Sequence, residues 1–227
     1  MAVAFDAVGP SSAGAANPSS TPSLSWSHTC SGSNRLLVVG VAVGTTSSDA
    51  SFVTTATYNG VAMTSVAKVH SNNQVNGYIQ MFYLINPDSG SNTVAITNNS
   101  NCDLAGGSVS FTGVDQSTPL DSPVTNFGDS TSGSVSVSTN VGDMVIDAMC
   151  NGSGFGSGGS TQTNRWLIND NSNTAAGNGA SSTASGVAGS VSMGYTGFSS
   201  DWWGLIGVNV KQFTAPPPGA TIAWLSV

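Results

Sequence analysis

The chain has 227 residues, which is enough for one large all-β domain or for two small ones. Charged residues make up only 7% of it and glutamate is absent, so the side chains that best stabilise long exposed helices are scarce. A formal net charge of -7 argues against a surface built to bind phosphate backbones. No stretch approaches the roughly 20 consecutive apolar residues of a membrane-spanning helix. We therefore expect neither nucleic acid nor membrane among the partners.

The beginning of the chain does not read as a secretory signal. Residues 1–12, MAVAFDAVGPSS, lack a basic region followed by an apolar region. The composition otherwise suits an extracellular protein. This combination indicates a mature fragment, an unusual secretion route or a viral protein that is released by lysis.

The first half of the chain alternates between apolar and polar residues over short stretches, as strands do. Residues 35–43 (RLLVVGVAV) are apolar on both faces, which predicts a central strand covered on both sides. The Pro-, Ser- and Ala-rich run between Gly9 and Pro22 is expected to be a loop. Asn59-Gly60 is the strongest hairpin signal in the chain. Strands are predicted at residues 3–7, 24–29, 35–43, 54–58, 61–69, 77–85 and 93–97.

The second half continues the same pattern, and further strands are predicted at residues 107–114, 134–138, 144–149, 163–168, 190–195 and 203–211. Residues 151–159 and 170–189 are rich in small and polar residues, so we expect them to be loops, either mobile or ordered by a neighbour. About a dozen short strands separated by turn signals are typical of a sandwich. The predicted fold is all-β, a jelly-roll-like antiparallel β-sandwich over residues 1–213.

Residues 214–227 form a separate Pro-rich linker and apolar C-terminal tail. Pro216, Pro217 and Pro218 predict a stiff polyproline spacer. The segment after it, ATIAWLSV, is apolar and β-prone. It is expected to add a strand either to its own sheet or to the sheet edge of a neighbouring subunit. The candidate assembly contacts are Ile222, Trp224 and Leu225.

The cysteines do not indicate a metal site. Cys30, Cys102 and Cys150 lack the spacing of metal ligands, and three is an odd number for a disulfide framework. Buried free thiols are the favoured interpretation, because free cysteine behaves as a small hydrophobic residue. One disulfide with one thiol left over stays open. We expect no metal and no cofactor.

Histidines offer little for catalysis. The chain has two, and no serine lies in a nucleophile elbow of the G-x-S-x-G type between a strand and a helix. His28 lies in an alternating strand close to Trp26, so a structural role is expected. His70 ends a hairpin strand and is expected to be exposed. The protein is therefore predicted not to be an enzyme.

Paired carboxylates could serve glycoside hydrolysis, and the two candidate pairs are Asp115 with Asp121 and Asp143 with Asp147. Residues 143 and 147 are four apart, so both could face one side of a strand. Asp143, however, follows a glycine in a predicted turn. Neither pair is expected to be catalytic.

Three other aspartates stand in polar stretches that could offer oxygen ligands to Ca²⁺. They are Asp103, Asp129 and Asp170. Because no D-x-D-x-D-G spacing is present, we expect solvated loop side chains and no calcium site. The sequences Asn98-Asn99-Ser100 and Asn151-Gly152-Ser153 match the glycosylation pattern, as often happens by chance in a chain rich in Asn and Ser.

Aromatic side chains suggest a sugar-binding platform as an alternative. Trp202 and Trp203 are the candidate surface aromatics, with Trp166 and Tyr195 as further members. Neighbours on a strand point to opposite faces, so at most one of Trp202 and Trp203 enters the core. Core packing competes with the platform for all four.

Six segments in order resemble a widespread β-sandwich domain. They are SLSWSHTCSGSNRLLVVGVAV, VTTATYNGVAMTSVA, FYLINPDSGSNTVAIT, GGSVSFTGVDQSTPLDSP, GDMVIDAM and WWGLIGVNVK. They are similar to domains of bacterial surface proteins and of structural proteins of tailed bacteriophages, and the resemblance covers roughly residues 5–213. The resemblance implies a jelly-roll-like sandwich without known catalytic residues, so no site residue is carried over. The single domain and the apolar tail depart from that pattern.

The leading hypothesis is a virion structural protein, a capsid decoration (cement) protein or another surface component of a tailed bacteriophage. Its expected location is the virion, and its partners are the major capsid protein or neighbouring copies of itself. One alternative is a carbohydrate-binding or adhesive module on the cell surface or outside the cell, with glycans as partners. Another is a subunit of an extracellular filament that uses its tail for strand donation.

Overall fold

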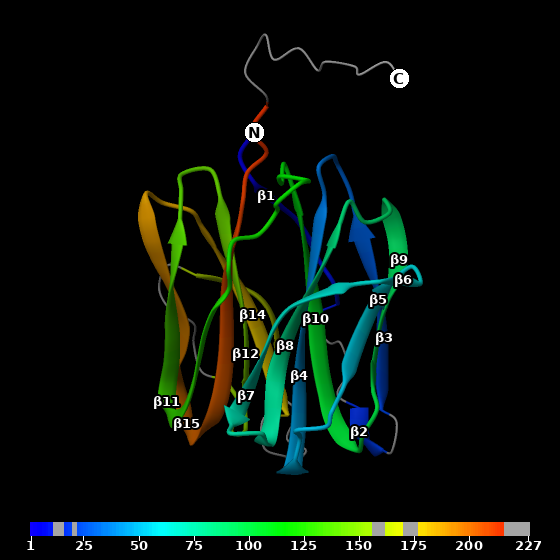
Figure 1. Cartoon of the computed structure of the whole chain (residues 1–227), viewed down its shortest axis with the longest axis vertical. Helices are drawn as coiled ribbons and strands as arrows, with labels where there is room; N and C mark the ends of the chain where they lie inside the picture. The colour runs from blue at the N-terminus through cyan, green and yellow to red at the C-terminus, as the bar shows by residue number, and fades with distance from the viewer. Residues whose placement is uncertain (11–15, 20–21, 156–161, 170–176, 216–227) are drawn as a thin grey trace, which may run out of the picture.

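The computed structural model describes residues 1–10, 16–19, 22–155, 162–169 and 177–215. Every regular element within these ranges is a β-strand, and the strands pair antiparallel in three sheets that stack side by side (Figure 1). The predicted all-β antiparallel sandwich is therefore confirmed, with one layer more than a simple two-sheet sandwich. The tail residues Ile222, Trp224 and Leu225 lie outside the described residues.

The middle sheet contains the most thoroughly buried strands. Its strand order is β1 (Ala4–Val8), β10 (Cys102–Thr112), β4 (Leu36–Ser48), β8 (Val75–Ile85) and β7 (Thr64–Asn72), with β2 (Ala16–Ser19) paired to β10. The first ten residues of β4 are buried, because a sheet covers each of its faces. This confirms the central strand expected from residues 35–43. The strand β2 lies within the run that was predicted to be a loop.

One face of the middle sheet is covered by a four-stranded sheet of β3 (Ser23–Cys30), β9 (Gly90–Asn98), β5 (Thr54–Tyr58) and β6 (Val61–Ala62). The predicted turn at Asn59-Gly60 joins β5 to β6, and positive φ values of 49° and 77° at these two residues fit the primed turn of a tight hairpin. The second hairpin strand is shorter than expected. After β6 the chain crosses at Met63 into β7 of the middle sheet, so residues 61–69 serve two sheets.

The other face is covered by a five-stranded sheet of β11 (Val124–Thr139), β15 (Gly189–Val210), β12 (Met144–Asn151), β14 (Asn178–Ser185) and β13 (Thr163–Ile168). β11 and β15 stay paired along almost their whole length and bend together, so that their outer arms curve back over the sheet (Figure 1). The Asn126 Nδ2 donates to the Ser134 carbonyl across this bend at 3.0 Å. We call the space inside the bend the curl.

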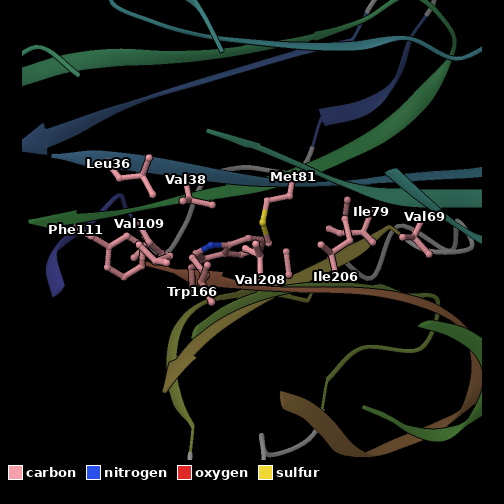
Figure 2. Close-up of a cluster of buried hydrophobic side chains, with 14 of the residues drawn as sticks. Leu36, Val38, Val69, Ile79, Met81, Val109, Phe111, Trp166, Ile206 and Val208 are labelled. Atoms are coloured by element: carbon pink, nitrogen blue, oxygen red, sulfur yellow. The ribbon is translucent and has the colours of Figure 1, made fainter. Parts of the chain in front are cut away.

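Each pair of facing layers encloses its own apolar core. The central core, between the middle and five-stranded sheets, includes Trp166 amid aliphatic side chains of β4, β8, β10 and β15 (Figure 2). A Cβ on Gly107 would lie 2.4 Å from the Trp166 ring, so this position must stay small. The four-strand core, between the middle and four-stranded sheets, includes Trp26, Tyr58 and Tyr78. The curl core lies inside the bent sheet and includes Val145, Met149 and Leu205.

Three expectations about element bounds are corrected. Residues 170–189 contain the buried strand β14, not only a loop. Its small side chains fit between two neighbours: a Cβ on Gly179 would lie 3.0 Å from the Trp166 ring, and Ser182 turns toward a carboxylate. β11 begins ten residues before the predicted 134, and the two strands predicted at 190–195 and 203–211 are arms of the single strand β15.

Candidate functional site

A fully buried carboxylate lies at the centre of the curl. Asp147 is in β12 and points to the same side as Val145 and Met149 of the curl core, as strand alternation requires. Its Oδ1 accepts from the Ser182 backbone N–H at 2.6 Å and from the Tyr195 hydroxyl at 3.0 Å. Its Oδ2 accepts from the Ser182 hydroxyl at 2.9 Å and from the Gln162 amide at 3.0 Å. The group thus joins β12, β14 and β15.

Burial raises the pKa of Asp147 from 3.8 to about 7. Its hydrogen bonds lower the pKa, and burial outweighs them. Burial together with the nearby Asp147 charge raises the pKa of Tyr195 well above 10, so that hydroxyl stays protonated and donates. The carboxylate therefore changes its charge near neutral pH while its partners do not.

Gln162 connects this carboxylate with the surface. Its Nε2 donates to Asp147 and also to the Ser182 hydroxyl, and its Oε1 accepts from the Gly194 N–H at 2.7 Å. Gln162, Gly194 and Tyr195 all line a hollow of about 510 Å³. One amide side chain thus forms part of the hollow wall and at the same time holds the buried carboxylate behind that wall.

We call this space the curl hollow. Its described lining consists of hydroxyl, amide, glycine and aromatic residues, none of them charged: Asn126, Ser132, Gly133, Ser134, Gln162, Ser192, Gly194, Tyr195, Thr196 and Trp203. Ser132, Ser134 and Ser192 are exposed to solvent. The Trp203 ring packs against Gly133, where a Cβ would lie 2.8 Å from it, and its Nε1 donates to Ser130 Oγ at 2.9 Å.

The arrangement suits the binding of a neutral polar ligand more than a reaction. Hydroxyl and amide groups hydrogen-bond to the hydroxyl groups of a ligand, while the largely buried Trp203 and Tyr195 add a small apolar part to the lining. Asp147 and Ser182, although hydrogen-bonded to each other, are both fully buried and lie behind the wall. A ligand in the hollow contacts them only through Gln162 and Tyr195.

Comparisons of the chain with family models, with curated proteins and with solved structures found no match. In the part of the chain that the structure describes, no helix is both long and apolar enough to cross a membrane. The fold and the geometry of the described residues therefore carry the argument about function.

The predicted aromatic platform is not assembled. Trp166 is in the central core with 3% of its surface exposed, and Trp203 is 4% exposed. Trp202 is partly exposed, so of the two candidate surface aromatics it is Trp202 that lies at the surface. Tyr195 is buried and turns its hydroxyl to Asp147. Strand alternation correctly predicted that at most one of the two adjacent tryptophans enters the core. It could not predict the bend that covers Trp203, because the bend depends on residues far along the chain.

Both histidines make contacts within the protein. The Ser108 hydroxyl accepts from Trp26 Nε1 at 2.8 Å and lies 2.8 Å from His28 Nδ1, so His28 has the structural position that was expected. Burial lowers the pKa of His28 from 6.5 to about 4. His70 is only partly exposed, and its Nδ1 lies 2.8 Å from the buried Asp49 carboxylate.

The members of the candidate carboxylate pairs hydrogen-bond to other partners. Asp143 accepts from the Gln212 backbone N–H and from Asn209 Nδ2, each at 2.9 Å. Asp121 accepts from the same Asn209 amide at 2.9 Å, so the structure brings Asp121 and Asp143 together. The sequence had paired each of these two aspartates with a different residue. Asp115 accepts from Ser117 and Thr118 in its own turn.

The residues considered for calcium are scattered. Asp103 is buried in β10 and Asp129 lies in β11, so neither is a loop residue as expected, and Asp170 lies outside the described residues. Among the described His, Cys, Asp and Glu side chains, no group of three is placed to hold a metal ion. Cys30, Cys102 and Cys150 are free and buried.

The glycosylation pattern falls on two buried asparagines. Asn98 Nδ2 donates to Thr54 Oγ1 and to the Tyr78 hydroxyl, each at 2.9 Å. Asn151 is fully buried, and its Nδ2 donates to the Gly154 carbonyl. Because both amides are used inside the fold, neither is accessible to a glycosylating enzyme in the folded chain.

Sequence reasoning overlooked Gln162 and Ser182, which complete the Asp147 cluster. Ser182 lies in the strand that was taken for a loop, and Gln162 lies just before β13 among many polar residues. The one available signal was Asp147 itself, an acidic residue inside the apolar run MVIDAM. A carboxylate in a buried strand needs donors nearby, but the sequence does not say which residues supply them.

Proposed function

We propose that the protein is a structural component of a virus particle, most specifically a decoration protein on the capsid surface of a tailed bacteriophage. The observation that carries the proposal is that polar side chains tie adjacent sheets together. Ser108 of β10 joins Trp26 and His28 of β3, and the Tyr78 hydroxyl lies 2.7 Å from Thr54 Oγ1 across the same pair of sheets. Such ties favour a rigid body, as a surface scaffold requires.

The third layer is tied in the same way. The Arg165 guanidinium of β13 lies 3.7 Å from the centre of the Phe5 ring of β1, and its Nε donates to Thr183 Oγ1 at 2.7 Å. Arg165 thus joins the five-stranded sheet to the middle sheet by a cation–π contact. This polar tie adds to the packing of the central core between these two layers.

The surface charge fits the same proposal. Each of the four basic side chains contacts the protein itself: Arg35 donates to the Pro87 carbonyl, Lys68 to the Phe52 carbonyl, and Arg165 and Lys211 contact Thr183 and Asp121. An acidic chain whose basic side chains all bind within the protein stays soluble at high local concentration, because its net charge opposes nonspecific aggregation. The proposed partners are the major capsid protein and neighbouring copies.

Mass spectrometry of purified particles and of the particle-free secreted fraction tests the proposal. We expect many copies per particle, at a fixed ratio to the major capsid protein, and rebinding of the purified protein to particles that lack it. Enrichment in the particle-free fraction, together with no binding to such particles, would overturn the virion assignment.

A sugar-binding module is the second candidate, and the curl hollow favours it. About 510 Å³ accommodates one or two sugar rings, and the lining offers neutral hydroxyl and amide groups beside Trp203 and Tyr195. Because the described lining is uncharged, a neutral ligand can bind in this hollow without leaving a charged side chain unpaired. The virion and sugar-binding proposals are compatible, because a surface protein can also contact host glycans.

A glycan array followed by calorimetry tests this second candidate. Replacing Ser192 with Tyr fills the hollow, whereas Ser190→Tyr places the same side chain on an exposed position of the same strand outside the lining. We expect S192Y to abolish binding and S190Y to retain it. If both variants bind equally, or if the wild-type protein binds no glycan on the array, the sugar-binding proposal is wrong.

A further inference from the structure

Two hollows on the side of the molecule are flanked by the same two stretches of chain. The first, of about 370 Å³, lies between β7 with its neighbour β8 and the segment 117–123. The second, of about 400 Å³, lies between the other half of β7 with the turn after it and the start of β11. We call them together the lateral groove. The two hollows lie one after the other along β7, since the first is lined by residues 65–66 and the second by residues 68–70.

The two strands beside the lateral groove are sheet edges. Among the residues that the structure describes, β7 is the last strand of the middle sheet and pairs only with β8, and β11 is the last strand of the five-stranded sheet and pairs only with β15. An edge strand offers backbone N–H and C=O groups to a further strand. The groove therefore lies beside two strand edges, to either of which a further strand can pair.

Apolar side chains surround the groove and are incompletely covered. Phe127 is 51% exposed, and Val124 beside it is 36% exposed. Val66, Tyr83 and Ile85, from the groove lining, are partly buried and pack against the central core from outside. A ligand that covers these side chains gains apolar burial as well as backbone hydrogen bonds.

The segment 220–227 of the same chain has matching properties. It is uncharged, apolar and β-prone, and eight residues span about 26 Å when extended, against about 30 Å for the nine residues of β7. Its attachment point is close to the groove. The Lys211 backbone N–H donates to the carbonyl of Pro119, a lining residue, at 2.8 Å, and the Phe213 N–H donates to Gly113.

We propose that residues 220–227 of one copy bind as an added strand in the lateral groove of a second copy. A second copy is favoured over the same copy because Pro216, Pro217 and Pro218 predict a stiff spacer that resists immediate reversal of the chain. This inference rests on the proposed function as an assembling surface protein and names the contact between neighbouring copies. The contact is head to tail, so it can continue from copy to copy.

Sedimentation velocity of the full chain and of a chain that lacks residues 220–227 is the first test. We expect concentration-dependent oligomers of the full chain and a monomer after the deletion. A fluorescent peptide of residues 214–227 should bind the shortened chain, and it should bind the full chain less well because its groove is already occupied. Oligomers that persist after the deletion would overturn the inference.

Phe127→Lys and Val187→Lys form a matched pair for the groove. Both side chains are exposed and apolar, 51% and 45% respectively, but only Phe127 lines the groove. We expect F127K to weaken peptide binding about tenfold or more, while V187K leaves it unchanged. Equal affinity of both variants, or a monomeric full chain with the tail bound in its own groove, would contradict the proposal.

These outcomes distinguish a failure of the inference from a failure of the proposed function. A shortened chain that still rebinds to particles at full ratio, but no longer forms oligomers, would retain the virion assignment. A chain that forms the expected oligomers but is absent from particles would retain the strand contact and reject the virion. Only the second result favours the filament alternative.

Discussion

His28, beside the four-strand core, and Asp147, beside the curl core, are both buried titratable side chains, and they respond to pH in opposite ways. His28 has its pKa lowered to about 4, and Asp147 has its pKa raised to about 7. Burial is the largest cause in both cases and favours the neutral form of each group. The shared lesson is that a buried side chain that links separate strands stabilises the fold most when it is uncharged.

The surroundings of the two groups differ in the number of partners. The Asp147 carboxylate accepts four hydrogen bonds from side chains and backbone. His28 is bound through Nδ1 to Ser108, and its Nε2 has no hydrogen-bonding partner among the described residues. The charged form of Asp147 is therefore partly supported, whereas the charged form of His28 has little support. Acid should weaken the four-strand core and strengthen the curl core.

Replacing Trp166 with Ala is expected to have the largest effect, because this ring fills the central core between the two regions. Large-to-small changes of this kind cost about 3–5 kcal/mol of unfolding free energy. Trp202→Ala is the control, since Trp202 is partly exposed and its removal should cost under about 1 kcal/mol. Urea unfolding measures both. Equal losses would mean that Trp166 does not fill the interface.

Asp147→Asn tests the curl core through pH. The pKa of Asp147 rises from 3.8 to about 7 on folding, so its contribution to stability is fully present below about 3.8 and is lost as pH rises through about 7. At about 1.4 kcal/mol per pKa unit the loss is at most about 4 kcal/mol. We expect the wild-type protein to lose this stability relative to D147N between pH 4 and pH 8. A constant difference would show that Asp147 does not titrate there.

His28→Gln tests the four-strand core in the opposite direction. The pKa of His28 falls from 6.5 to about 4 on folding, so its contribution is fully present above about 6.5 and is lost as pH falls through about 4. The loss is at most about 3 kcal/mol. Relative to H28Q, the wild-type protein should therefore weaken on acidification. Weakening of both proteins alike would assign the acid sensitivity to another group.

Two glycine replacements, one in each region, are expected to cost the least stability of the changes compared between the two regions. Gly60, in the β5–β6 turn, and Gly189, at the start of β15, have positive φ values of 77° and 116°, and a Cβ on either would meet no atom within 4 Å. Gly60→Ala should cost about 1 kcal/mol through backbone strain alone, and Gly189→Ala at least as much. Thermal unfolding measures both. A stabilising result at either position would show that the turn relaxes.

Local patterns predicted the parts of the fold whose neighbours are close in sequence. The Asn59-Gly60 turn was found because two residues with positive φ are sufficient to define a tight hairpin. The burial of residues 35–43 followed from apolar side chains on both faces. Crossing of the chain at Met63 was not found, because residues 61–69 alternate in the same way whichever sheet they join.

Most of the candidate site could not be predicted, because its members come from separate strands. Asp147 was singled out, but as a partner of Asp143, whereas its partners are Gln162, Ser182 and Tyr195. The strand β14, which contains Ser182, has a single β-branched residue, Thr183, and no aromatic residue, so it lacks most of the signal by which strands are recognised. Its small side chains are selected by the Trp166 ring and by the buried carboxylate, and both belong to other strands.

The sequence by itself determined that this protein is all-β, because period-two alternation, turn residues and the absence of glutamate act over a few neighbouring positions. Only the tertiary structure decided that a third layer bends over itself, that Trp203 is enclosed and Trp202 is not, and that Asp147 lies behind the wall of a hollow. These features depend on which strands pair over long separations. A strand with the same alternation can join any of several edges, and only the packing of the whole chain selects one.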